Sequence, residues 1–149
     1  GLASGVAAAV KALRPAARVI GVEPDLAADA RESLARGEIV EWSAADVSRT
    51  IADGTRTQAL GERTFAHLRA LLDDIVTVTE EEIAAGVRIA AEEARLVVEP
   101  SGALGIAGKC GIAEEAEIPT VHKQLSPRVE PDRAVAHEGA VFCLIREVK

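Results

Sequence analysis

Short segments rich in β-branched residues alternate along this chain with segments of helical periodicity. Strands are expected at 18–22 and 75–78, and helices at 4–13, at 26–35 and from Thr64 onward. This alternation favours βαβ units, since parallel strands need a crossover connection, usually a helix. We therefore expect an α/β fold, a three-layer sandwich in which helices cover both faces of a mostly parallel sheet.

Local signals predict where several of these elements begin and end. Ser4 is a candidate cap for the first helix, with Val6, Val10 and Leu13 on one stripe, and Gly37 is expected to end the second helix. Residues 38–62 are weakly patterned.

The later helices carry clearer start signals. Thr79-Glu80-Glu81-Glu82 has the pattern of a capping box, and helical spacing continues to about Arg95. Another helix is predicted to start at Glu99-Pro100. Beyond Gly105 the pattern weakens: 110–117 is polar, 118–121 is a weak strand, and 140–148 is a plausible strand.

Composition narrows the class of protein. The 149 residues suit one globular domain, and 48% are hydrophobic, which is enough to bury a core. The net charge is −7 and no basic run is present, so nucleic acid and anionic membrane surfaces are not expected as partners.

Other counts bear on the compartment and on the extent of the chain. Two cysteines, Cys110 and Cys143, fit a reducing compartment, and we expect a cytoplasmic protein because neither a spanning segment nor a signal peptide is visible. No methionine occurs anywhere, including position 1. We therefore expect this sequence to be part of a longer protein.

Two segments are candidate ligand sites from their residues alone. Gly1-Leu2-Ala3-Ser4-Gly5 leads into a helix whose start can bind an anion such as phosphate, although glycine before a helix is also an ordinary turn. Glu23, Asp25 and Asp29 follow a strand end, where they are either hard ligands for Mg²⁺ or Ca²⁺ or a solvated acidic turn.

Three further acidic segments are less distinctive. Asp53-Gly54 reads as a turn, and Glu99 is either the anion at a helix start or a site carboxylate. The glutamates at 80–82 and 92–93 are predicted to be solvated helix faces. His67, His122 and His137 are too far apart in sequence for metal-ligand spacing.

Five motifs occur in one order and spacing that resembles a known family. This order is similar to the C-terminal half of the serine/threonine dehydratase and serine racemase family, which are fold type II pyridoxal-phosphate enzymes of the tryptophan synthase β-like fold. The likeness runs from residue 1 to about 104. The motifs are Gly1-Leu2-Ala3-Ser4-Gly5, Val19-Ile20-Gly21-Val22-Glu23-Pro24, Thr50-Ile51-Ala52-Asp53-Gly54, Asp73 to Ile83, and Val97-Val98-Glu99-Pro100-Ser101-Gly102-Ala103.

The resemblance assigns cofactor-binding roles. Gly1 matches the last glycine of the family's tetraglycine phosphate loop, and Leu2 is the residue after it; the first three glycines are not in this sequence. Gly54 matches a loop beside the cofactor ring, and Glu99 matches a carboxylate near the cofactor. The implied cofactor is pyridoxal phosphate.

The resemblance also implies a cation site. Serine racemase-like members bind a divalent cation with the Glu of this Glu-Pro turn, a main-chain carbonyl four residues on, and an Asp two residues further. Glu23, Ala27 and Asp29 occupy these places, so the resemblance favours Mg²⁺ or Ca²⁺, in a structural or activating role, over a bare acidic turn.

The family's lysine, which carries the cofactor and moves the α-proton, lies in its N-terminal half, and nothing here matches the Ser-x-Lys motif. No catalytic residue is therefore assigned. The implied activity is that of an ammonia-lyase (dehydratase) on L-serine, L-threonine or a related hydroxy-amino acid, with racemase activity as an accompaniment, in a homo-oligomeric full-length protein. The alternative is a non-catalytic remnant that folds, binds a divalent cation or associates with a partner.

The last third departs from the family pattern. The family's Ser-Gly-Gly-Asn-like turn is missing, and Ser126 lacks the glycines that would follow it. We therefore divide the chain into a partial cofactor-binding α/β domain at 1–104 and a divergent segment at 105–149. A genuine divergent tail and a frame shift both stay open, as does the identity of the hydroxy-amino acid.

Overall fold

A three-stranded sheet forms the centre of the protein. The computed structural model describes residues 1–114 and 142–146, and the strand order is β2-β1-β3. Strands β1 (Arg18–Pro24) and β2 (Asp74–Val78) are parallel, with Val22 opposite Val76, whereas β3 (Phe142–Arg146) is antiparallel to β1. The parallel pair confirms the predicted α/β class, and the third strand makes the sheet mixed.

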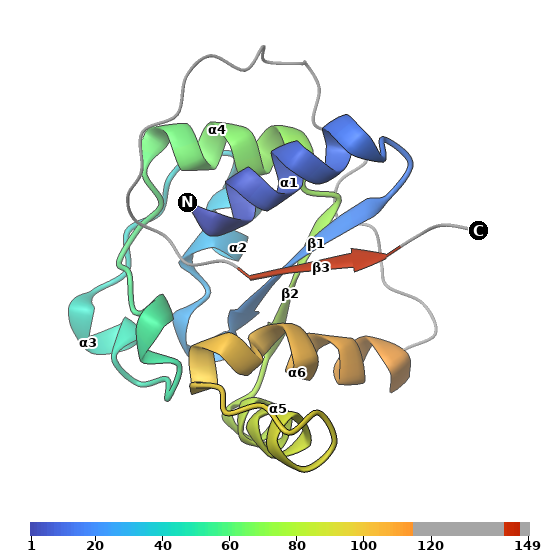
Figure 1. Cartoon of the computed structure of the whole chain (residues 1–149). Helices are drawn as coiled ribbons and strands as arrows, with labels where there is room; N and C mark the ends of the chain where they lie inside the picture. Colours follow the sequence, from blue (N-terminus) through green and yellow to red (C-terminus); the bar gives the residue numbers. More distant parts are fainter. Residues whose placement is uncertain (115–141, 147–149) are drawn as a thin grey trace.

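Helices cover both faces of this sheet, as Figure 1 shows, and the predicted three-layer arrangement is confirmed. One face carries α1 (Leu2–Leu13), α2 (Asp29–Arg36) and α4 (Glu62–Leu71). The other carries α5 (Glu80–Glu92) and α6 (Pro100–Glu114). No helix within the described residues is long and apolar enough to cross a membrane.

Each face of the sheet has its own apolar core, because successive side chains of a strand point to opposite faces. Val19 and Ile75 pack with Leu34 and Leu68 under the first helical layer. Val22 and Val78 face the second layer. There α5 and α6 approach so closely that a Cβ on Gly86 would lie 3.1 Å from the carbonyl oxygen of Ala103.

The start of α1 differs from the prediction. The helix begins at Leu2 with Gly1 as its N-cap residue, so Ser4 is inside the first turn and is not the cap. Its fully buried residues are Ala3 and Ala7; of the predicted stripe, Val10 is partly buried against the core, whereas Leu13 is 78% exposed. Two alanines therefore make the most deeply buried contacts of this helix, which hydrophobicity alone does not indicate.

The second predicted helix is two elements. A 3₁₀ turn covers Asp25–Ala27, and α2 begins only at Asp29, because Ala28 leaves helical geometry with φ −105° and ψ 41°. This break places the Asp29 side chain in the first turn of a helix. The predicted end is confirmed: Gly37 closes α2 in the left-handed conformation, with φ 74°.

The remaining helices follow their start signals with shifted ends. Helix α4 begins at Glu62, two residues before Thr64, and the capping box of α5 is present in both directions, between Thr79 and Glu82. Helix α5 ends at Glu92 rather than near Arg95, which has a positive φ of 58°.

Helix α6 begins at Pro100 as predicted, but it extends well past the point where the sequence pattern weakens. It reaches Glu114, so 110–114 is helical rather than patternless, and the helix crosses the division drawn between 104 and 105. The strand predicted at 140–148 is confirmed over Phe142–Arg146. The weak strand at 118–121, His122, Ser126 and His137 lie outside the described residues.

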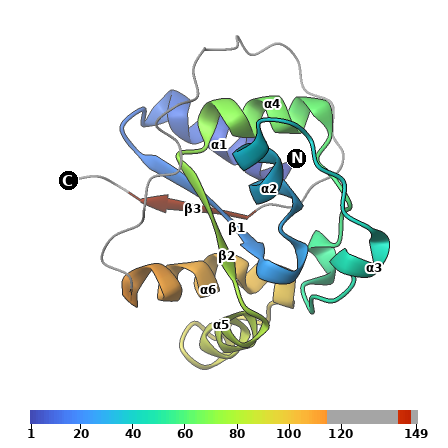
Figure 2. The same cartoon turned by 180° about the vertical axis from the view of Figure 1, so that it is seen from behind.

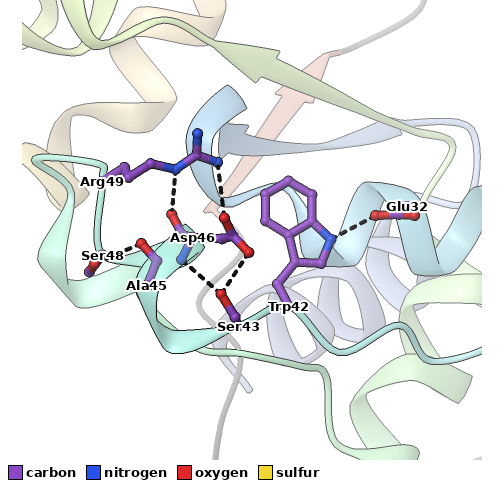
Figure 3. A network of polar contacts seen from close by, with 7 residues as sticks. All are labelled: Glu32, Trp42, Ser43, Ala45, Asp46, Ser48 and Arg49. Atoms are coloured by element: carbon purple, nitrogen blue, oxygen red, sulfur yellow. Dashed lines mark hydrogen bonds and ion pairs between the residues drawn. The ribbon is translucent and has the colours of Figure 1, made fainter.

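The weakly patterned segment between α2 and α4 is ordered by polar side chains rather than by an apolar stripe. Figure 3 shows Trp42 donating from Nε1 to Glu32 Oε2 over 2.6 Å, which fastens the segment to α2. Ser43 caps the short helix α3 (Ala44–Val47) by accepting the Asp46 amide, and the Arg49 Nε donates to the Asp46 carbonyl. These contacts join single residues and leave no periodic signal in the sequence.

Candidate functional site

The carboxyl end of β1 is where the predicted site segments gather. Ligands of open α/β sheets bind outside the carboxyl ends of the strands. Glu23 lies at this end of β1, and the loop around Asp53–Thr55 and the start of α6 lie toward the same end. In Figure 2 the chain's N-terminus, which begins α1, is on this side as well.

Gly54 and Ser101 make the contact that joins two of the predicted cofactor segments. The Gly54 amide donates to the Oγ of Ser101 over 2.8 Å, and Ser101 is only 1% exposed. A Cβ built on Gly54 would lie 2.7 Å from that Oγ and 3.5 Å from Oε1 of Glu99. Position 54 therefore has no room for a side chain, and the Glu99 carboxylate lies directly beside its backbone.

The backbone N–H groups of the loop that carries Gly54 are all hydrogen-bonded. Every amide from residue 51 to residue 57 donates a hydrogen bond, most of them to acceptors within 50–55. Two leave the segment: the Gly54 amide reaches Ser101, and the Ile51 amide reaches Oε2 of Glu80 over 2.6 Å. The guanidinium of Arg56, an exposed residue, closes the loop by donating twice to the carbonyl of Thr50.

Gly1 and Leu2 form the amino end of α1. The helix has no side-chain cap, and Leu2 is 60% exposed. A helix start presents backbone N–H groups and the positive end of the helix dipole, which attract anions. The predicted phosphate position therefore lies at the amino end of a 12-residue helix.

Glu23, near the end of β1, and Asp29, at the start of α2, form a buried acidic pair. They are 3% and 2% exposed, and Ala27, which lies between them in the sequence, is 1% exposed. Glu23 Oε2 accepts the amide of Arg31 over 2.9 Å. Asp29 Oδ2 is buried and has no hydrogen-bond partner among the described residues. The predicted solvated alternative is therefore wrong for these two carboxylates, although Asp25 beside them is exposed.

Burial also changes the acidity of the pair. Loss of solvation, followed by the neighbouring charge of Asp29, raises the pKa of Glu23 from 4.5 to about 8. Loss of solvation raises the pKa of Asp29 from 3.8 to about 6. Both carboxylates consequently gain from a nearby positive charge, and a buried anionic oxygen without a donor suits a hard cation.

The donor set indicates which metals fit. Within residues 1–114 and 142–146, no group of three or more His, Cys, Asp or Glu side chains that could hold a metal ion is present, so the predicted set has only two side-chain ligands. Two carboxylates and a main-chain carbonyl are all oxygen donors, and such a set leaves room for water ligands, as Mg²⁺ prefers.

Two residues that contact the Gly54 loop are not predicted from the sequence. The sequence places Ser101 in a motif without indicating a role for it, and it predicts that Glu80 is solvated. Instead, Glu80 is half-buried, one of its oxygens accepts the Ile51 amide, and the other is buried. The motif containing Ser101 could have pointed to it, whereas nothing in the spacing of Glu80 indicates its contact.

Comparison with known proteins shows which family has this arrangement. A family model described as "Pyridoxal-phosphate dependent enzyme" matches residues 1–121. The L-threo-3-hydroxyaspartate ammonia-lyase of Saccharomyces cerevisiae is 44% identical over 108 residues, which is 72% of this chain and 32% of that protein. The serine racemase of Schizosaccharomyces pombe is 39% identical over 115 residues, covering 77% of this chain and 35% of that protein.

A solved structure agrees with these relatives. The crystal structure of the T.th. threonine deaminase superposes with a TM-score of 0.73 at 41% identity, covering 85% of this chain and 47% of that one. The chain spans about a third of the length of the curated relatives it matches.

Proposed function

Because this chain belongs to the family of pyridoxal-phosphate dependent enzymes, we propose that it forms part of the cofactor-binding half of an ammonia-lyase. The substrate class is L-serine, L-threonine or a related hydroxy-amino acid, with racemisation as a second activity. The observation that carries this proposal is the hydrogen bond from Gly54 to Ser101, because it brings the predicted ring-side loop and the Glu99 segment into one place. The similarity to ammonia-lyases and a serine racemase supports the substrate class.

Four residues of this chain would hold the cofactor. The amide groups of Gly1 and Leu2, at the start of α1, would bind its phosphate. The backbone of Gly54, packed against Ser101 where no side chain fits, would lie beside its ring, and the Glu99 carboxylate would lie next to it. When bound, pyridoxal phosphate supplies an electron sink for the charge left as the substrate's α-proton leaves.

A divalent cation is the second proposed ligand. Glu23 and Asp29 would each supply a carboxylate oxygen and Ala27 its carbonyl, with Mg²⁺ or Ca²⁺ as the ion. The buried, unpartnered Oδ2 of Asp29 supports this assignment, because an unpaired anionic oxygen away from water is costly. The ion's role would be structural or activating, since it would anchor the turn after β1 to the start of α2.

The proposal requires a lysine that this chain does not supply in the expected context. The family's Ser-x-Lys motif and three more glycines are expected upstream in the same reading frame. The decisive experiment is to express that longer polypeptide and assay it with L-serine, L-threonine and L-threo-3-hydroxyaspartate. Keto acid and ammonia should form from at least one of them, whereas the 149-residue chain with pyridoxal phosphate should give no keto acid above the free-cofactor background.

Two outcomes would contradict parts of this proposal. A frame without the lysine would favour the non-catalytic alternative, in which the fold binds a cation or a partner. Keto acid formed by the 149-residue chain alone would show that another group replaces the missing lysine. Homo-oligomeric assembly of the longer polypeptide stays a prediction, to be measured by light scattering.

A further inference from the structure

Glu80 lies outside the residues that would touch the cofactor, yet it holds the loop that would. Its Oε2 accepts the Ile51 amide over 2.6 Å, from the first turn of α5 and across 29 residues of sequence. Ile51 is three residues before Gly54, and the chain between them is closed by local hydrogen bonds. A displacement at Ile51 would therefore be transmitted to Gly54.

The loop has few other connections to the body of the protein through its backbone. Of the amides at 51–57, the described hydrogen bonds of Ile51 and Gly54 alone leave the segment. Ser101 accepts the hydrogen bond of the Gly54 amide and, like Glu99, lies beside the Gly54 backbone. Glu80 accepts the hydrogen bond of the Ile51 amide and connects the loop to a different helix, so the loop is hydrogen-bonded to the body of the protein at two separate points, in addition to the packing of Ala52 in the apolar core.

The chemistry of this bond makes it stronger than a neutral contact. A carboxylate that accepts a backbone N–H forms a charge-assisted hydrogen bond, which is shorter and about twice as strong as a neutral one. The 2.6 Å separation is shorter than an ordinary N–H···O bond, which agrees with an ionised acceptor. Oε1 of Glu80 is buried and has no hydrogen-bond partner among the described residues, so the bond to Ile51 is the polar contact through which this side chain acts.

We propose that Glu80 is a positioning residue that fixes the 50–56 loop, and with it the Gly54 backbone, against the start of α6. The assignment of a cofactor to that backbone rests on the proposed function. The immobilisation of the loop itself does not, so the two can be tested separately.

Amide hydrogen exchange on the 149-residue chain tests the immobilisation directly. Glu80→Ala should speed exchange at Ile51 by about tenfold or more, since it removes a charge-assisted bond worth roughly one factor of ten or above, and exchange at Gly54 should rise with it. Amides of β1 should keep their rates. Glu81→Ala is the matched control, because it removes the same charge from the same turn at an exposed position.

Glu80→Gln separates the hydrogen bond from the rest of the side chain. Because Oε1 accepts nothing in the described contacts, replacing one oxygen with an amide group removes no bond, and the remaining oxygen still accepts the Ile51 amide. This variant should give an exchange rate at Ile51 between those of the wild type and Glu80→Ala, because a neutral acceptor remains but the charge assistance is lost. Equal rates at Ile51 in Glu80→Ala and Glu81→Ala would overturn the proposal, as would a rise spread evenly over all amides.

The longer polypeptide tests the consequence for the cofactor. There Glu80→Ala should increase the dissociation constant of pyridoxal phosphate severalfold, measured by cofactor fluorescence, while Glu81→Ala leaves it unchanged. Faster exchange at Ile51 with unchanged cofactor affinity would overturn the positioning role. If even the unsubstituted polypeptide binds no cofactor, the proposed function fails, and the exchange result on the 149-residue chain still decides whether Glu80 holds the loop.

Discussion

The backbone amide of Gly54 donates to the buried Oγ of Ser101 over 2.8 Å, and this hydrogen bond connects positions that are 47 residues apart. It joins the turn at Asp53–Thr55 to the first turn of α6. Both segments carry residues that the family resemblance assigns to the cofactor. Their meeting is a property of the folded chain, because neither segment contains a signal for the other.

Gly54→Ala should destabilise this junction. The new Cβ would lie 2.7 Å from Ser101 Oγ, so the loop or α6 must shift, at a cost of about 1–3 kcal/mol in the free energy of unfolding. Gly5→Ala is the control: nothing lies within 4 Å of its Cβ position, and alanine in a helix should add about 0.5–1 kcal/mol. Urea titration measures both, and equal stabilities for the two variants would contradict the predicted close approach.

Mg²⁺ or Ca²⁺ should raise the melting temperature of the chain. Binding to the folded state alone adds roughly 2.7 kcal/mol at a hundredfold excess over the dissociation constant. Asp29→Ala should abolish the rise because it removes a proposed ligand. Asp25→Ala should keep most of it, since Asp25 is an exposed neighbour without a ligand role. If both variants respond to the cation like the parent, the acidic pair binds no ion.

The fluorescence of Trp42 should report the same binding event. It is the one tryptophan of the chain, and its Nε1 donates to Glu32 on α2, the helix that begins at Asp29. Ordering of that helix by a cation should change the emission intensity or wavelength of Trp42. Asp29→Ala should remove the change, and a signal that persists in this variant would assign it to ions bound elsewhere.

Without added cation, stability should fall as the pH rises from about 5 to about 8. The folded state keeps a proton on Glu23 up to a pKa of about 8, whereas the unfolded chain releases it near 4.5, so the folded state binds more protons across this window. Glu23→Gln should flatten the decline. Denaturant titrations at several pH values measure it, and identical slopes for parent and variant would show that Glu23 is not the group responsible.

Asp73→Ala should cost more stability than Lys11→Ala. Oδ2 of Asp73 accepts both the Val19 amide over 2.6 Å and the Lys11 ammonium over 2.7 Å at the start of β1. Losing the carboxylate leaves a part-buried strand amide without its acceptor, a cost of about 1–3 kcal/mol. Losing Lys11 removes an ion pair that is partly exposed, a cost of about 1 kcal/mol or less. Thermal unfolding of both variants orders the two losses.

Local signals in the sequence determined the class of fold and many element boundaries. The β-branched runs of β1 and β2, the capping box between Thr79 and Glu82, and the left-handed Gly37 all depend on neighbours within a few residues. The energies of these elements depend on backbone geometry and on nearby hydrogen bonds, so the elements can be predicted from the local sequence. The resemblance through five motifs added the family, which the comparisons confirm.

Tertiary structure alone decided which polar groups meet. The sequence places Glu80 on a helix start and Ile51 in a weakly patterned loop, and only the packing of α5 beside that loop brings their atoms to 2.6 Å. Likewise, burial rather than composition distinguishes Asp29 from the exposed Asp25 four residues earlier. Solvation and hydrogen bonding depend on atoms that are distant in sequence, and for this reason periodicity and spacing do not reveal them.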